Sequence, residues 1–229
     1  MSYLYLFVNL GAIIIPFLYS FHKKLQFNKA WKAFGLSNII SISPFLIWDI
    51  IFTEKGIWGF NPDYLTGIYL WNLPLEEVLF FICIPYACVF TWHCFDILYW
   101  KNGFLPSIKT LDYILIIGSS IIAITCYNQL YTFYTFLFLA LLLLVLTLKS
   151  INWLSSFYIT YLVLLIPFTI VNGILTGTGI ESEIVWYNPD HNFNIRMLSI
   201  PIEDIFYGMT LILLNVSLFE YFKKRLQRP

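Results

Sequence analysis

Two pairs of adjacent carboxylates, Glu76-Glu77 and Glu203-Asp204, each follow a proline and open a long apolar run. Each pair stands in the pattern Pro-[Leu/Ile]-Glu-[Glu/Asp]. Ionisable groups inside a membrane-length apolar segment are costly, so they are functional candidates by default. Because crowded like charges cannot all ionise, at least one of the four acids is expected to keep its proton. Such a site would hold a proton donor beside ionised bases, and acid–base catalysis requires both.

The sequence around the acidic motifs is duplicated. Asn61-Pro62-Asp63 lies eleven residues before Pro74, and Asn188-Pro189-Asp190 lies eleven residues before Pro201. Ungapped agreement over two separated motifs is typical of an internal repeat rather than of chance. Further upstream, the match continues between Pro44-Phe45 with Asp49 in the first copy and Pro167-Phe168 with Asn172 in the second.

Each acidic motif is predicted to begin a helix, because proline is tolerated in the first helical turn and Asn72 and Ser199 are good N-cap residues. The carboxylates then fall in the first turn. Acids there could simply complement the helix dipole, by about 0.3–1 kcal/mol, or be solvated at a membrane surface. The duplication favours a functional role over these simpler explanations. Adjacent helical residues point about 100° apart, so at least one acid of each pair should face the bundle interior.

The Asn-Pro-Asp segments are turn sequences, and a single copy would indicate only an ordinary turn in a loop. Their repeated spacing predicts that they fold back over the carboxylates. The side chains then expected to hold the proton donor are Asn61, Asp63, Asn188 and Asp190. Aromatic side chains also cluster around both motifs, and aromatic faces stabilise cations. The supporting or substrate-binding aromatic residues predicted from this are Trp58, Trp186, Phe80 and Tyr207.

The composition places the chain in a membrane. Of its 229 residues, 59% are hydrophobic and only 11% are charged, and the mean hydropathy is +0.76, whereas soluble domains carry about 25% charged residues. The net charge of zero makes nucleic acid a poor partner. The cysteines and histidines show no metal-ligand spacing, and no nucleotide-binding motif is present, so we expect no metal and no cofactor. The first 20 residues lack a basic n-region and a cleavage site and are interpreted as a retained helix.

Seven apolar segments are long enough to cross a bilayer, and the fold class predicted is an all-α polytopic membrane protein. The expected spans cover residues 2–20, 33–53, 74–95, 111–127, 130–148, 153–173 and 200–220. With the N-terminus outside and the C-terminus cytoplasmic, eleven of the thirteen Lys and Arg residues fall on the inner side, as the positive-inside rule requires. The other two, Lys55 and Arg196, fall outside. The expected location is therefore the cell (inner) membrane.

The repeat accounts for the odd number of spans. We expect a first three-helix unit over residues 1–98, a connector with the fourth helix over 99–128, and a second three-helix unit over 129–229. The extra crossing makes the two units parallel, so that both acidic motifs meet on one membrane face.

These motifs and this helix plan resemble the heterodimer-type lycopene cyclases, here as one fused two-repeat chain. The resemblance covers essentially the whole sequence. It implies an isomerase (an intramolecular lyase) that cyclises the ψ ends of lycopene to β-ionone rings without flavin, a lycopene β-cyclase of carotenoid biosynthesis. The substrate implied is a lipid-soluble carotenoid, and further expected partners are other carotenoid enzymes. Carried onto this sequence, the catalytic carboxylates are Glu76, Glu77, Glu203 and Asp204.

Two alternatives stay open from sequence. Sugar transporters of the SWEET type also join two parallel three-helix units through one helix, and the acids would then serve a solute or proton relay. A transporter site should lie near the bilayer midplane, whereas these motifs stand at helix starts. The other alternative is a cyclase with a different product, carrying ε or γ rings or made from a C50 carotenoid.

Overall fold

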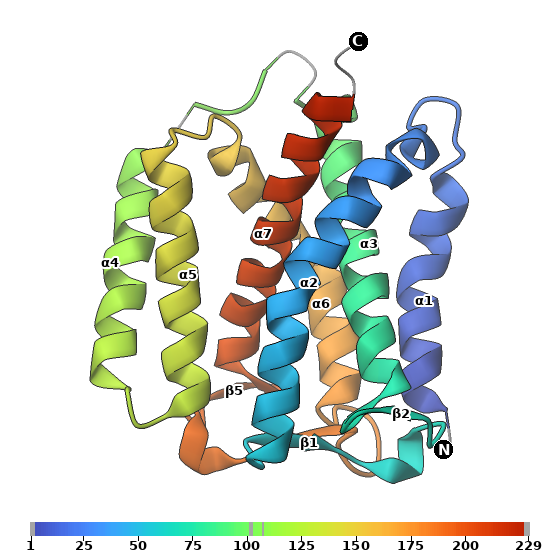
Figure 1. Ribbon diagram of the computed structural model, residues 1–229, viewed down its shortest axis with the longest axis vertical. Helices are drawn as coiled ribbons and strands as arrows, with labels where there is room; N and C mark the ends of the chain where they lie inside the picture. Colours follow the sequence, from blue (N-terminus) through green and yellow to red (C-terminus); the bar gives the residue numbers. More distant parts are fainter. Residues whose placement is uncertain (1–2, 101–102, 107, 227–229) are drawn as a thin grey trace.

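The computed structural model describes residues 3–100, 103–106 and 108–226, and 71% of these residues are helical. Over these residues seven α-helices lie side by side, and each apolar segment predicted from sequence coincides with one of them within a few residues (Figure 1). The helices are α1 Leu4–Tyr19, α2 Trp31–Glu54, α3 Leu75–Leu98, α4 Lys109–Thr125, α5 Leu130–Leu148, α6 Leu154–Leu175 and α7 Ile202–Leu226. Short strands join them at one end: β1 Trp58–Phe60, β2 Tyr69–Leu70, β3 Leu73–Pro74, β4 Val185–Tyr187, β5 Arg196–Met197 and β6 Ile200–Pro201.

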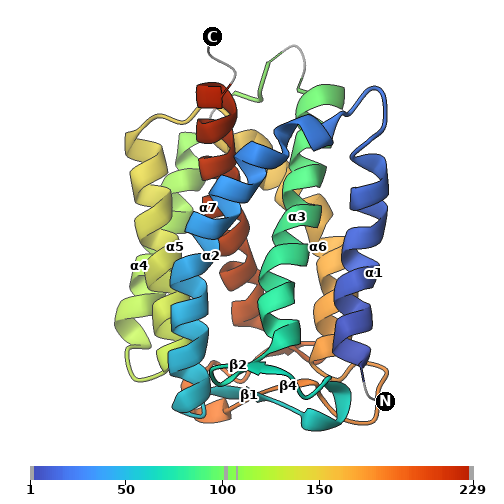
Figure 2. The same ribbon diagram turned by 45° about the vertical axis from the view of Figure 1, so that its right-hand side comes forward.

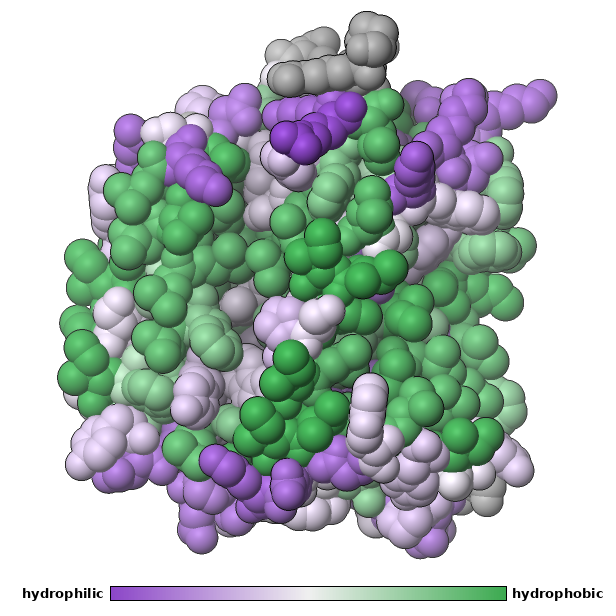
Figure 3. Space-filling view, in the orientation of Figure 1, coloured by the Kyte–Doolittle hydropathy of each residue, from purple (hydrophilic) through white to green (hydrophobic). Residues whose placement is uncertain are grey.

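The outside of the bundle is apolar, as an integral membrane protein requires. Hydrophobic side chains form a broad band around the visible face, and hydrophilic residues gather at its two ends (Figure 3). Five helices, α2, α3, α5, α6 and α7, are long and apolar enough to cross a bilayer, whereas α1 is shorter. α4 has only 17 residues. Membrane crossing by all seven helices therefore stays a prediction.

The six strands lie at the end of the bundle that also holds the N-terminus, called here the strand end (Figures 1 and 2). The opposite end, called here the basic end, holds the C-terminal end of α7 and the loops after α1, α3 and α5. Both acidic motifs lie at the strand end, because α3 and α7 begin there. α4 runs back along the bundle between α3 and α5, so that α5, α6 and α7 run in the same directions as α1, α2 and α3 (Figure 1).

The two halves are related by an approximate two-fold axis that runs along the bundle through the β1–β4 pair. Asn61 N donates to Ile184 O and Asn188 N donates to Ile57 O, both at 2.8 Å. A shift of 127 residues converts one bond into the other. The same shift relates the β2–β3 hairpin to the β5–β6 hairpin. At the centre, Gly59 pairs with Trp186, its own repeat equivalent, so the axis passes between these two residues.

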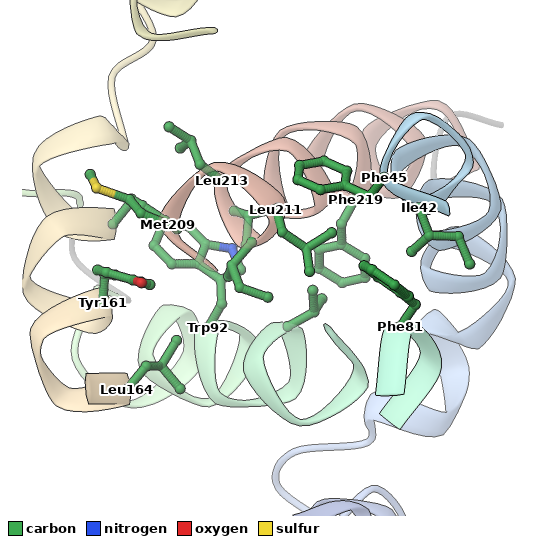
Figure 4. Close-up of a cluster of buried hydrophobic side chains, with 14 of the residues drawn as sticks. Ile42, Phe45, Phe81, Trp92, Tyr161, Leu164, Met209, Leu211, Leu213 and Phe219 are labelled. Carbon is green, nitrogen blue, oxygen red and sulfur yellow. The ribbon is translucent and has the colours of Figure 1, made fainter. Parts of the chain in front are cut away.

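The core lies where α7 crosses α2, α3 and α6. Figure 4 shows Phe45, Phe81, Leu164 and Leu211 directed into the space between these helices, and all are buried. Polar side chains also hold the bundle together. Between α2 and α7, Asn215 Nδ2 donates to Asn38 Oδ1 at 2.7 Å, although such bonds contribute only modestly inside a membrane.

The starts of α3 and α7 differ in detail from the prediction. The acids do lie in the first helical turn, but Pro74 and Pro201 lie in β3 and β6, before the helices. Neither predicted N-cap side chain caps its helix: Asn72 donates to Ile50 O at 2.9 Å, and Ser199 Oγ bonds to Thr176 and Thr178. The hairpins take these residues away from the helix termini, because the chain makes a tight turn at Trp71 and again at Leu198, both with positive φ.

Candidate active site

A cavity of about 660 Å³ extends from the strand end along the bundle, between α1, α3, α6 and α7. Its lining is mostly apolar, but three carboxyl groups reach it: Asp49 from α2, Glu77 from α3 and Asp204 from α7. These side chains are at most 8% exposed. A largely apolar cavity with a few convergent polar groups is the usual form of a site for a small molecule.

Glu77 and Asp204 are repeat equivalents, and each accepts a hydrogen bond from a buried tyrosine. Tyr5 of α1 donates to Glu77 Oε2, and Tyr131 of α5 donates to Asp204 Oδ1, both at 2.5 Å. Asp204 accepts a second hydrogen bond at its other oxygen, Oδ2, from the Tyr187 hydroxyl at 3.1 Å. Burial, with the neighbouring Asp204 charge, raises the pKa of the Tyr187 hydroxyl well above its usual value. Tyr187 therefore stays a neutral donor to this carboxyl group.

Asp49 is the third acid of the cavity, and sequence analysis did not assign it to the site. Trp58 Nε1 donates to Asp49 Oδ1 at 2.6 Å, and Thr53 approaches the same oxygen at 3.4 Å. The other oxygen, Oδ2, is buried and has no donor among the described residues. The Asp49 carboxyl group lies within hydrogen-bonding reach of the Glu77 carboxyl group. A hydrogen bond between two carboxyl groups requires that one of them carries a proton.

Glu76 and Glu203, the first acids of each pair, do not line the cavity. Both side chains are completely buried. Glu76 Oε1 accepts from Thr66 N at 2.6 Å, and Glu203 Oε1 accepts from Phe193 N at 2.7 Å. These bonds fix the loops that lead into the β2–β3 and β5–β6 hairpins. Catalysis by Glu76 and Glu203 stays a prediction, but their contacts are those of residues that hold loops.

The Asn-Pro-Asp turns lie at the strand end. The sequence predicted that their side chains hold the carboxyl groups, and this prediction is wrong. Asn61 and Asn188 each accept from the backbone N–H of the aspartate two residues later, at 3.0 Å. Asp63 and Asp190 are exposed. The turns act instead through their neighbours along the chain, because the loop after each turn supplies the N–H that binds the buried glutamate.

Three of the four predicted aromatic residues, Trp58, Phe80 and Tyr207, line the cavity. Trp186 does not. It is 38% exposed and lies over Gly59 on the outer side of the β1–β4 pair. Tyr131 stacks on Tyr187 with ring centroids 5.6 Å apart. The aromatic rings thus surround the side of the cavity that carries Asp204.

Three residues at the cavity were not predicted from the sequence as site residues: Asp49, Tyr5 and Tyr131. An acid inside the apolar run of α2 was a signal for Asp49, because such a position is costly without a function. The tyrosines gave no such signal, since each is one of 16 tyrosines in the chain. Within the described residues, no group of three His, Cys, Asp or Glu side chains is arranged to hold a metal ion.

The fold and this site define a helical integral membrane protein with an apolar cavity that contains buried acids. The sequence model of the family described as lycopene cyclase matches residues 2–95 and 128–222, which correspond closely to the two predicted repeats and leave out the predicted connector. The chain therefore belongs to the lycopene cyclase family, and its function is that of a carotenoid cyclase. No curated protein and no solved structure gives a significant match. The family assignment favours an enzyme over the transporter alternative.

Proposed function

We propose that the chain is a flavin-independent lycopene β-cyclase, in which Glu77, Asp49 and Asp204 carry the acid–base chemistry. The observation behind this proposal is the one apolar cavity that three buried carboxyl groups share. Cyclisation of a ψ end is a net isomerisation that begins and ends with proton transfer. It therefore needs a proton donor and a proton acceptor close together, away from water.

The Glu77–Asp49 pair is the proposed donor. The two carboxyl groups share a proton, and Tyr5 and Trp58 hold their outer oxygens in place. The proton passes to the terminal double bond of the ψ end and leaves a tertiary carbocation. An internal double bond attacks this cation and closes a six-membered ring, which moves the positive charge onto the ring. Aromatic faces such as those of Trp58 and Tyr207 stabilise that charge.

Asp204 is the proposed acceptor. It accepts hydrogen bonds from Tyr131 and Tyr187, and donors aimed at a carboxylate stabilise its ionised form. Removal of a proton from the ring carbon that carries the polyene places the double bond of a β ring. The proton then returns to the Glu77–Asp49 pair, so that no proton is consumed overall.

The first test is expression in a bacterium that accumulates lycopene, with extraction of the pigments. We expect the wild type to convert lycopene to cyclic carotenes with β rings. Glu77→Gln and Asp204→Asn should each lower turnover about 10²-fold or more, which is the usual contribution of a general acid or base. Glu76→Gln and Glu203→Gln are matched neighbours that keep an acceptor oxygen for the loops, so they should retain most of the activity.

Unchanged lycopene with wild-type protein present in the membrane would contradict the proposed function. Full activity of Glu77→Gln and Asp204→Asn, together with loss in the two neighbouring variants, would instead transfer the chemistry to Glu76 and Glu203. ε or γ rings in the product would keep the cyclase and overturn the proposed ring type.

A further inference from the structure

Apart from its part at the strand end, where Asp49 of α2 and Tyr131 of α5 reach it, the cavity lies on one side of the two-fold axis. Its walls are α1 and α6, and its base is formed by α3 and α7. We call the line along which two neighbouring helices face each other a seam. The two-fold axis relates the seam between α1 and α6, called the open seam, to the seam between α5 and α2, called the filled seam. A symmetric molecule would therefore contain a second cavity against α5 and α2.

Aromatic side chains fill that second seam. Trp48 of α2 packs against Phe138 and Tyr134 of α5, with ring centroids 5.2 and 6.3 Å apart. Phe52, one turn further along α2, packs against the same Tyr134 at 5.8 Å. These rings occupy the space that would correspond to the cavity.

Smaller residues stand at the equivalent positions of the open seam. Tyr5 of α1 and Tyr131 of α5 are equivalent, because each donates to one of the two equivalent carboxyl groups. They align α1 with α5 at a shift of 126 residues. The equivalents of Tyr134 and Phe138 are then Val8 and Ala12, and both line the cavity.

The partner helices show the same contrast. The prolines inside α2 and α6, Pro44 and Pro167, align these helices at a shift of 123 residues. The equivalent of Trp48 is then Val171, which also lines the cavity. Three aromatic side chains in one seam thus correspond to three small aliphatic side chains in the other.

The acids follow the same asymmetry. Glu77 and Asp204 come from different repeats, yet both open into the one cavity. The equivalent of the third acid, Asp49, is Asn172, which cannot act as an acid. The chain therefore carries one set of acid and base, which the two repeats assemble together.

The open seam faces the lipid. Phe7 and Ile15 of α1 and Ile170 of α6 line the cavity and are 62%, 63% and 62% exposed. Along α3 the lining runs from Glu77 to Thr91, a distance of about 21 Å at 1.5 Å per residue. This shape suits one end group at the acids with the polyene extending between α1 and α6 toward the bilayer.

We propose that the chain has a single catalytic groove, which takes one end of the carotenoid through the α1–α6 seam, so that the two ends are cyclised in separate binding events. The proposal rests on the proposed function. The second end group lies a full molecule's length from the acids and reaches them only after the carotenoid has left the groove and turned round. A monocyclic carotene is therefore released into the membrane before the bicyclic product forms.

A time course with purified enzyme in lipid vesicles that contain excess lycopene tests this order. Monocyclic carotene should rise first, to a concentration above that of the enzyme, and then fall as bicyclic carotene appears. Bicyclic product that forms while the monocyclic carotene stays below the enzyme concentration would overturn the proposal. Failure of the proposed function would look different, because the wild type would then form no cyclic carotene.

The groove itself is tested by substituting aromatic residues of the α5–α2 seam at the equivalent positions of the α1–α6 seam. Val8→Tyr with Ala12→Phe places the residues of the second repeat in α1 and should lower cyclisation about tenfold or more. Ile14→Phe is the control, because Ile14 is on the same helix, is 54% exposed and lies outside the cavity lining. Wild-type turnover in the double variant would overturn access through this seam. The vesicle time course, which uses the wild type, decides the question of one groove should the double variant fail to reach the membrane.

Discussion

At the scale of single residues, the helical phase of each acid decides its role. Glu76 and Glu77 are adjacent, yet the first binds a loop N–H and the second reaches the cavity. The doubled motif in the sequence predicted where the acids would gather. It could not predict which acid of each pair faces the cavity, because the phase of a helix depends on packing against its neighbours. Asp49 was missed for a related reason, since it comes from a helix without the motif.

Replacement of Asp49 by Asn tests the proposed donor pair. The amide keeps the shape of the side chain and an oxygen that accepts from Trp58, but it cannot share a proton with Glu77. We expect turnover to fall about 10²-fold or more, with the KM for lycopene nearly unchanged because the cavity keeps its shape. Activity is measured as initial rates in lipid vesicles, and Asp63→Asn, an exposed acid outside the cavity, is the control. Wild-type turnover in Asp49→Asn would exclude Asp49 from the chemistry.

At the scale of elements, the repeat and the helices were predictable from the sequence, whereas the pairing of β1 with β4 was not. Strands of three residues carry too little alternation to be recognised. The sequence predicted that both Trp58 and Trp186 support the site, but a shift of 127 residues pairs Gly59 with Trp186 on the axis. Trp58 therefore reaches the cavity, where it binds Asp49, and Trp186 lies on the opposite side of the strand pair.

The close contact at the axis gives a prediction for Gly59. A Cβ at this position would lie 2.4 Å from the Trp186 ring, so Gly59→Ala must displace the indole. We expect a loss of about 1–3 kcal/mol, the usual cost of overpacking, seen as a lower midpoint of thermal unfolding in detergent. Gly59→Ala combined with Trp186→Ala removes the obstructing ring and should recover stability relative to Gly59→Ala alone. Equal destabilisation with and without Trp186 would show that the contact is not the cause.

At the scale of the whole molecule, the charges are divided between the two ends of the bundle. The basic end carries nine of the described Lys and Arg residues: Lys23, Lys24, Lys29, Lys32, Lys109, Lys149, Lys223, Lys224 and Arg225. The strand end carries two, Lys55 and Arg196, and the predicted inner-side residues Lys101 and Arg228 lie outside the described residues. Counting charges along the chain could predict this division, because it needs only the number of helices and not their packing.

The division of charge predicts the orientation in the cell membrane, with the basic end in the cytoplasm and the site near the outer face. Single cysteines test this in a variant in which the four native cysteines are replaced. Glu181→Cys, in an exposed loop at the strand end, should react with a membrane-impermeant maleimide in intact cells. Lys24→Cys, exposed at the basic end, should react only after the cells are permeabilised. The reverse pattern would invert the orientation and place the acids at the cytoplasmic face, while the cavity and its chemistry would remain unchanged.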